Sequence, residues 1–186
     1  NGPATAFLKN MVSSDPFKEA TSGALSRIRH VQDMRDREAV NRFLSFYLLG
    51  WDRSPDWDFD DRLGLALLHF NRMSQEQQTA IGEAFLTSMR ANYRVFGDAA
   101  FRKPSRPNAK RMPFNIALFD VFSTLFTRWK EATLTQHASQ INDAFYRLGE
   151  KSAYVRSLSA ATTSAEAVAT RFNITEQMLR EVLGDP

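Results

Sequence analysis

The stretch that decides the fold is Pro-Phe-Asn-Ile-Ala-Leu-Phe-Asp-Val-Phe-Ser-Thr-Leu-Phe-Thr-Arg-Trp, residues 113–129. Apolar side chains fall on every side of the helix that this segment would form, and such a helix is usually the central one of a bundle. Pro113 suits the first turn of a helix, because that turn leaves its N–H groups unpaired and proline has none. We therefore expect residues 113–129 to form one buried, central helix.

Helical periodicity continues on the N-terminal side of this segment. Asp33 is a plausible N-cap of a first helix. After it, apolar residues recur at intervals of three and four, and Gly50 should end this helix. A second helix should open at Asp60 or Asp61. A third should begin at the capping box Ser74–Gln77, in which a serine and a glutamine each satisfy a backbone N–H of the first turn.

The rest of the chain also favours helices. Residues 98–112 form the one clear loop, and shorter helical patterns surround Ile141, Val168 and Met178, with Thr175 as a candidate cap for the last. Neither the alternation of a strand nor the turn of a hairpin occurs. The sequence predicts an all-α fold, an irregular multi-helix bundle of roughly seven to nine helices.

Composition limits the classes of protein. Of the 186 residues, 43% are hydrophobic and 12% aromatic, which excludes global disorder, and the net charge of +3 allows an anionic partner without demanding one. The absence of cysteine excludes disulfides, cysteine zinc sites and a cysteine nucleophile, and suits a cytoplasmic protein. No targeting segment or apolar run long enough for a membrane occurs, so no membrane partner is expected. We expect one helical domain, residues 1–186. Because the sequence begins with Asn1 and not with a methionine, we expect this domain to come from a longer or processed product.

Enzyme signatures are missing from the sequence. The phosphate-binding loop Gly-x-x-x-x-Gly-Lys-Ser/Thr does not occur, nor do His-Glu-x-x-His and His-Asn-His, and the three histidines are scattered. Asp56, Asp58 and Asp60 alternate as in a calcium loop, but the turn glycine is missing and Leu67 stands where the bidentate glutamate belongs. We therefore predict no catalytic residue, no metal and no cofactor in this chain.

The loop between the third and central helices is strongly basic. Five cations occur there without an acidic residue between them: Arg102, Lys103, Arg106, Lys110 and Arg111. Arginine forks bind phosphate oxygens in pairs, so this run is a candidate phosphate- or DNA-binding site. The alternative is a solvated loop whose cations pair with the aspartate-rich segment 52–61.

Several segments together resemble one bacterial family. Residues 34–44, Met-Arg-Asp-Arg-Glu-Ala-Val-Asn-Arg-Phe-Leu, are similar to its M-x-D-R-E-x-V-x-R-F-L helix. Residues 95–104 and 113–120 are similar to its F-G-x-x-A-F-R and I-N-x-A-L-F-[DE] signatures, and the tail from Ser157 to Leu183 also fits. The family is that of the DGQQR-motif proteins, which is similar to the GmrSD-type modification-dependent restriction enzymes and to related antiphage defence proteins. The residues that carry the resemblance, expected to be structural, are Asp36, Arg37, Glu38, Arg42, Phe43, Phe101, Asn115 and Phe119.

The resemblance implies that the catalytic motifs of the family lie in domains other than this one. In the family, the Asp-Gly-Gln-Gln-Arg signature lies in an N-terminal ParB/sulfiredoxin-like α/β domain credited with nucleotide binding or hydrolysis, and some members add a C-terminal His-Asn-His nuclease. Neither motif occurs in this sequence. The resemblance therefore implies that this chain is the helical half that follows the DGQQR domain. The parent protein would be an NTP-dependent nuclease. No catalytic residue of the family is transferred to this chain.

Two functions follow as hypotheses. The first is a helical support and interaction domain that packs against the N-terminal domain of its parent, against a second copy or against DNA. The alternative is a stand-alone helical module for dimerisation or nucleic-acid binding. Both expect association, because the N-terminal segment has more apolar residues than an exposed arm would carry: Phe7, Leu8, Met11, Val12 and Phe17.

Overall fold

Helices account for 76% of the residues that the structure, a computed structural model, describes, namely 2–25, 33–52, 58–104 and 111–186. The ten α-helices among these residues are α1 (Pro3–Ser13), α2 (Asp15–Thr21), α4 (Arg35–Leu49), α5 (Phe59–Arg72), α6 (Gln75–Phe96), α7 (Ile116–Leu125), α8 (Glu131–Gln136), α9 (Ala138–Leu148), α10 (Ser152–Ser157) and α11 (Ala165–Leu183). Two 3-10 helices follow α6 and α7, η1 (Gly97–Ala99) and η2 (Phe126–Arg128). The expected all-α bundle is confirmed, and the two helices of six residues, α8 and α10, take the number just above seven to nine.

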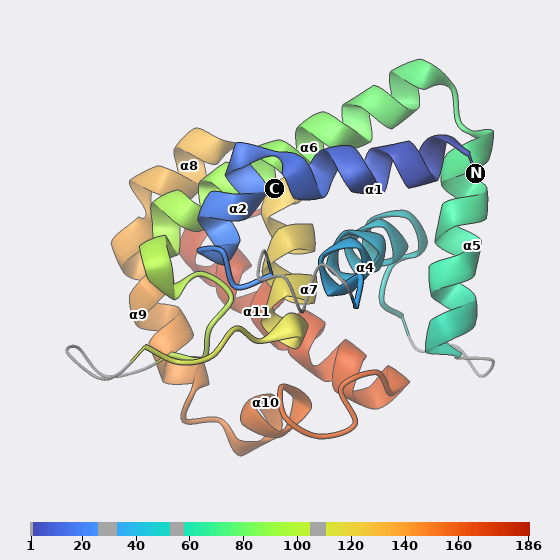
Figure 1. Ribbon diagram of the computed structural model, residues 1–186. Coiled ribbons are helices and arrows are strands. Elements are labelled where there is room, and N and C mark those ends of the chain that lie inside the picture. The colour runs from blue at the N-terminus through green and yellow to red at the C-terminus, as the bar shows by residue number, and fades with distance from the viewer. Residues whose placement is uncertain (1, 26–32, 53–57, 105–110) are drawn as a thin grey trace.

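Helix α7 lies at the centre of the bundle, where α4, α6 and α11 pack against it (Figure 1). Every residue from Ala117 to Phe126 is buried, as the all-round apolar pattern predicts. The start of the helix differs from the expectation: Pro113 lies in the irregular segment ahead of it, and Asn115 is the N-cap. The side-chain oxygen of Asn115 accepts a hydrogen bond from the backbone N–H of Leu118 at 3.0 Å, so it satisfies a donor of the first turn. The side chain of a proline has no acceptor for this bond.

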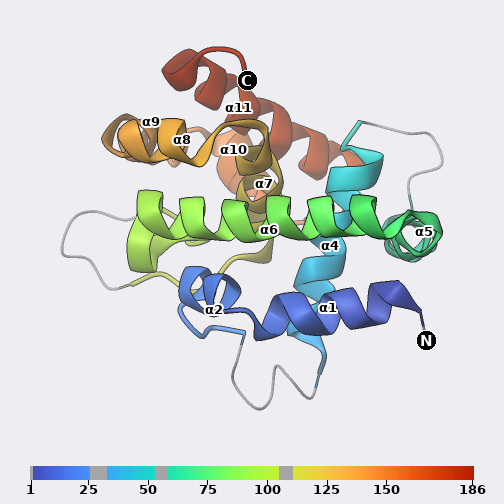
Figure 2. The ribbon, with the colours of Figure 1, turned by 90° about the horizontal axis from the view of Figure 1, so that it is seen from above.

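Helix α6, at 22 residues the longest of the described helices, divides the molecule into two sides (Figure 2). Helices α1 and α2 pack against one side of it, and α8 and α9 against the other. Aromatic rings join these layers: the ring centroids of Phe85 and Phe43 are 4.8 Å apart, and those of Phe96 and Phe122 are 5.0 Å apart. A single apolar core thus runs through α6 into α7 and α4.

The ends of α4 and α6 follow the sequence signals closely. The capping box of α6 is confirmed, since the side chain of Ser74 accepts the N–H of Gln77 at 3.3 Å and the side chain of Gln77 accepts the N–H of Ser74 at 2.9 Å. Gly50 ends α4 with a φ of 70°, a left-handed value that glycine adopts without steric cost. Helix α4 contributes residues to the site described below.

The starts of α4 and α5 differ from the expectation. Asp33 does not cap α4, because Met34 occupies the N-cap position with a φ of 55° and Asp33 instead forms an ion pair of 3.7 Å with the first residue of the helix. Helix α5 is capped by Asp58, whose carboxylate accepts the N–H of Asp61 at 2.9 Å, so it begins just ahead of the expected Asp60 or Asp61. Capping is a sufficient role for Asp58.

Helix α11 is continuous where the sequence predicted two shorter helices, around Val168 and around Met178. Thr175 therefore lies in the middle of a helix and does not cap one. Its hydroxyl oxygen lies 3.0 Å from that of Tyr154 on α10, and both side chains are fully buried. A buried hydroxyl needs a partner, and this pair satisfies both.

The N-terminal helices belong to the core of the same chain. Phe7 and Phe17 are buried, and the other apolar residues of this segment, Leu8, Met11 and Val12, are half-buried against the core. The ring centroids of Phe7 and Phe70 are 4.5 Å apart, which joins α1 to α5. Phe7 and Phe17 therefore need no external partner, and the expected association stays a prediction.

Candidate functional site: a basic pocket joined to a buried charge cluster

Three charged side chains meet inside the bundle at Asp120 of α7. Arg42 of α4 donates from Nε and Nη2 to the two carboxylate oxygens of Asp120, at 2.8 and 2.5 Å. Arg171 of α11 donates from Nη2 to Oδ2 of the same carboxylate at 2.9 Å. Asp120 and Arg171 are fully buried and Arg42 is 3% exposed. One carboxylate thus ties together three helices that are far apart in sequence.

The cluster carries more positive than negative charge. Burial lowers the pKa of both arginines and the Asp120 carboxylate raises it, with a net rise for Arg42 and a net fall for Arg171. An arginine starts from so high a value that both remain charged. Arg171 also donates to the carbonyl of Thr162 at 2.7 Å, and Arg42 lies 3.7 Å from the carboxylate of Glu38, one turn earlier on α4. Glu38 is exposed and extends the cluster toward the surface.

Tyr154 lies beside this cluster, and its buried hydroxyl makes the free energy of unfolding depend on pH. Burial raises the pKa of its hydroxyl, and the hydrogen bond with Thr175 and the charge of Arg171 offset only part of the rise. An unfolded tyrosine loses its proton near pH 10, so its contribution to stability is complete below that pH and is lost as pH rises. We expect the free energy of unfolding to fall above about pH 10, by up to about 1.4 kcal/mol per pH unit.

The measurement is urea denaturation between about pH 8 and pH 12, made on the unchanged chain and on Tyr154→Phe. The phenylalanine variant has no proton to lose at this position, so the difference in stability between the two proteins should shrink as pH rises above about 10. A difference that stays constant over this range would contradict the role of Tyr154.

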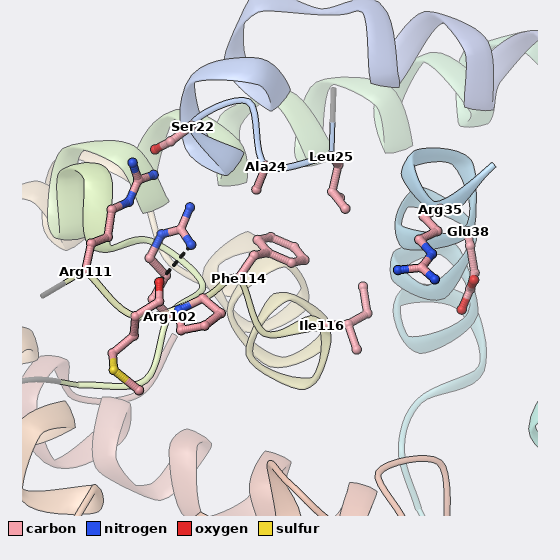
Figure 3. A pocket seen from close by; sticks show the side chains of 11 residues that line it. Ser22, Ala24, Leu25, Arg35, Glu38, Arg102, Arg111, Phe114 and Ile116 are labelled. Atoms are coloured by element: carbon pink, nitrogen blue, oxygen red, sulfur yellow. Dashed lines mark hydrogen bonds between the residues drawn. The ribbon is translucent and has the colours of Figure 1, made fainter. Parts of the chain in front are cut away.

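A pocket of about 780 Å³ opens where α4 faces the segment that leads into α7 (Figure 3). Its charged lining consists of three arginines, Arg35, Arg102 and Arg111, and one carboxylate, Glu38. The remainder is mainly apolar: Ala24, Leu25, Met112, Pro113, Phe114 and Ile116, together with Ser22. Glu38 joins this pocket to the buried cluster, since it lines the first and lies 3.7 Å from the guanidinium of Arg42 in the second.

The structure divides the predicted basic site. Arg102 is only 6% exposed, and its guanidinium donates to the carbonyls of Asp98, Met112 and Thr21 at 3.0, 2.9 and 3.5 Å, so its hydrogen bonds hold the chain in shape. Lys103 donates to the hydroxyl of Ser159 at 2.7 Å, and Arg111 is exposed at the pocket. The two other predicted residues, Arg106 and Lys110, lie outside the described residues.

The alternative pairing with the aspartate-rich segment receives no support from the described part of that segment. Asp58, Asp60 and Asp61 begin α5, which both views place at the opposite end of the molecule from residues 98–104 (Figures 1 and 2). Asp56 lies outside the described residues. Over the described ranges, no group of three or more His, Asp or Glu side chains is arranged to hold a metal ion.

The residues that carry the family resemblance meet around one part of the core. Arg42 reaches Asp120, the residue after Phe119, and the ring centroids of Phe119 and Phe101 are 4.9 Å apart. Asn115 joins the same region, because its backbone N–H donates to the carbonyl of Phe101 at 2.8 Å. Phe101 has a φ of 58°, which is rare for a bulky residue, and this hydrogen bond and its buried ring hold it there.

The remaining signature residues lie on α4. Phe43 is fully buried, 4.8 Å from the ring of Phe85, and the buried carboxylate of Asp36 accepts the N–H of Arg37 at 2.7 Å. Glu38 is exposed and lines the pocket. The contribution of Asp120 and Arg171 was not foreseen, although the sequence offers one signal, a lone aspartate within the most apolar helix.

Comparison of this chain with protein-family models, with curated proteins and with solved structures found no match. None of the helices in the described ranges has the length and apolar character needed to cross a membrane.

Proposed function

We propose that this chain is the helical support and interaction domain of a cytoplasmic, DGQQR-motif defence protein similar to the GmrSD-type restriction enzymes. The observation that carries the proposal is the convergence at Asp120. Segment 34–44 contributes Arg42, segment 113–120 contributes Asp120 and Phe119, and the tail contributes Arg171. Three segments that resemble the family thus meet at one buried charge cluster.

This placement supports a structural role for the signature residues. Arg42, Asp120 and Arg171 are buried at 3% exposure or less, out of reach of a substrate, and each one is used to join helices. A domain whose distinctive residues hold helices together is suited to carry another domain. The nucleotide chemistry or DNA cleavage of the parent would then belong to that other domain.

The gene around this chain tests the family assignment directly. The coding sequence upstream of Asn1 should encode an Asp-Gly-Gln-Gln-Arg motif within an α/β domain. Joint purification of that region with this chain should then give a stable complex. A gene that encodes the helical domain without such a motif would overturn the assignment.

The purified chain should hydrolyse no nucleotide and cut no DNA. The assay incubates it with each nucleoside triphosphate and with plain and base-modified DNA, in the presence of Mg²⁺. Turnover that persists through further purification and disappears on mutation of a single acidic residue would refute the support role.

One observation favours the alternative of a stand-alone dimerisation module. On α5, Leu65 and Leu68 are 43% and 54% exposed, and no atom outside the helix lies within 4 Å of the position that a Cβ on Gly64 would take. A small residue beside exposed leucines allows a second helix to approach closely. Light scattering would show a dimer that Leu68→Glu dissociates if this face pairs with a second copy.

Contact between the basic segment and DNA predicts a steep dependence on salt. Each phosphate neutralised in a duplex contributes about −0.9 to the slope of log K against log salt. Arg111, exposed and without a hydrogen bond or ion pair to any residue the structure describes, is the best placed cation, so Arg111→Ala should make that slope less negative by about 0.9. Fluorescence anisotropy with a labelled duplex at several salt concentrations measures it, and an unchanged slope would exclude Arg111 from the contact.

A further inference from the structure

Helix α5 lies at the edge of the molecule in both views (Figures 1 and 2). Its inner face packs against α4 and α1: the ring centroids of Phe59 and Phe46 are 6.0 Å apart, and those of Phe70 and Phe7 are 4.5 Å apart. The buried residues of α5 are Phe59, Ala66 and Phe70, and at about 100° per residue all three fall on this inner face. The opposite side of α5 is therefore turned away from the core of the chain.

Four exposed residues form a stripe along this outward side of the helix: Asp61, Leu65, Leu68 and Arg72. Their spacing of four, three and four residues keeps them within about 60° of one another around the helix axis. The same spacing marks the seam of a coiled coil, in which the a and d positions of a heptad face a second helix. The two central positions of this α5 stripe carry leucine, where a helix face that meets only water would carry polar residues.

The two ends of the α5 stripe carry opposite charges. Asp61 lies in the first turn of the helix, and Arg72 is its last residue, about 16 Å further along the axis. Neither side chain forms a hydrogen bond or ion pair with any residue that the structure describes. The charges at both ends are therefore available to a partner.

The α5 stripe is complementary to a copy of itself that runs in the opposite direction. Asp61 and Arg72 lie at equal distances from the midpoint of the stripe, and so do Leu65 and Leu68. In an antiparallel pair centred on that midpoint, each Asp61 meets the Arg72 of the other copy, and each Leu65 meets the other copy's Leu68. A parallel pair would place like charges against each other at both ends, which costs affinity.

We propose that two copies of this chain associate through α5 as an antiparallel helix pair about a two-fold axis, with the leucines at the centre and an Asp61–Arg72 ion pair at each end. Gly64 borders the stripe, and no atom outside the helix lies within 4 Å of the position of a Cβ there, so the second helix can approach closely on that side. The proposal rests on the contact with a second copy that was considered above. It adds the symmetry, the direction and the residue pairs, and it suits a support domain as well as a stand-alone module.

The dimer should be weak, because its interface is small. One pair of 14-residue helices should bury less than the ~1,200 Å² of a stable interface, so we expect a Kd above about 10 µM. Denaturation at low micromolar concentration therefore measures the stability of the single chain. Association has to be measured at concentrations that approach millimolar.

Sedimentation equilibrium from micromolar to millimolar concentration tests the proposal. The unchanged chain should show a monomer–dimer equilibrium without larger species, since an interface with two-fold symmetry closes on itself. Asp61→Arg and Arg72→Asp each place like charges at both ends of the helix pair. Each variant should therefore self-associate at least about 10-fold more weakly than the unchanged chain.

A mixture of the two variants gives the sharpest result. In an equimolar mixture, Asp61→Arg supplies a stripe with two cations and Arg72→Asp a stripe with two acids, so the variants should pair with each other although neither pairs with itself. The double variant Asp61→Arg, Arg72→Asp carries the charges in reversed order and should regain the association of the unchanged chain. A parallel pair predicts no loss in either single variant.

Two controls make the same charge changes elsewhere. Asp143→Arg and Arg147→Asp alter exposed residues of α9, which both views place on the other side of the molecule from α5, and both should leave association unchanged. Because the chain has no cysteine, engineered thiols report the direction of the pair without background. Asp61→Cys should form a disulfide with Arg72→Cys in a mixture, and not with itself.

Four outcomes would overturn the proposal. They are a monomer at millimolar concentration, single charge variants that associate as well as the unchanged chain, no pairing in their mixture, and an equal loss in the α9 controls. Circular dichroism of each variant shows that the fold is intact. None of these results bears on the coding sequence upstream of Asn1, so this proposal and the family assignment fail separately.

Discussion

Replacing Asp120 with alanine should lower the free energy of unfolding by about 3–5 kcal/mol, because it leaves two buried guanidinium groups without the carboxylate between them. Arg42 and Arg171 are both within 3 Å of that carboxylate, and both are buried. The lost attraction is only part of the cost. The larger part is the desolvation of charges that no longer have their partner.

Urea denaturation followed by circular dichroism measures this loss, and Asp120→Asn separates charge from shape. Asparagine keeps the size and one oxygen acceptor, so a loss close to that of alanine would assign the effect to charge. The control is Asp185→Ala, because Asp185 is 84% exposed in its ion pair with Arg180 and the substitution should leave the midpoint nearly unchanged. A loss below about 1 kcal/mol for Asp120→Ala would show that the cluster contributes no more than a surface pair does.

The triple variant Arg42→Met, Asp120→Leu, Arg171→Met separates stability from specificity. Replacing a whole buried ion cluster with apolar residues of similar volume is often neutral or stabilising. We expect the triple variant to recover most of the stability that Asp120→Ala loses. If it does, and complex formation with the proposed N-terminal domain is nevertheless impaired, the cluster serves to position helices rather than to stabilise the chain.

The sequence predicted the centre of the fold well, because helical burial leaves a strong local signal. The middle of the all-round apolar segment forms α7, its end forms the 3-10 helix η2, and the capping box of Ser74 and Gln77 starts α6. Both signals depend on residues within one or two turns. Such local patterns survive in a folded protein when no tertiary contact opposes them.

The errors lie where tertiary contacts override local preference. Thr175 is a good capping residue, but the buried hydroxyl of Tyr154 gives it a partner inside a continuous α11. Pro113 suits a helix start, but the chain ahead of α7 is held by the bond from the N–H of Asn115 to the carbonyl of Phe101. No local pattern reports contacts between residues so far apart.

The candidate site could be predicted only in part for the same reason. The run of cations in residues 98–112 identified Arg102 and Arg111, since both belong to one segment of sequence. Arg35 and Glu38 come from α4, more than sixty residues earlier, and only the packing of α4 beside α7 brings them to the pocket. The sequence also predicts phosphate binding for both Arg102 and Arg111, although Arg102 is buried and Arg111 is exposed.

The second large effect is expected at Phe122, also on α7. Its side chain is 1% exposed, and its ring centroid lies 5.0 Å from Phe96, 5.0 Å from Phe145 and 5.4 Å from Phe126. Truncation to alanine removes the ring and leaves a cavity that three other rings border. We therefore expect Phe122→Ala to lower the free energy of unfolding by about 3–5 kcal/mol.

Chemical denaturation checks this value, with Leu68→Ala as the matched control. Leu68 is also an apolar residue on a helix, but it is 54% exposed on α5, so its truncation removes little buried surface and should change stability within about 0.5 kcal/mol. Both variants truncate an apolar side chain on a helix, so a larger loss of stability in Phe122→Ala than in Leu68→Ala would be due to the burial of Phe122. Phe122→Leu should fall between them, because leucine fills part of the cavity. If Phe122→Ala costs less than about 1 kcal/mol, the rings around it can close the cavity, and α7 is not the rigid centre on which the other helices are positioned.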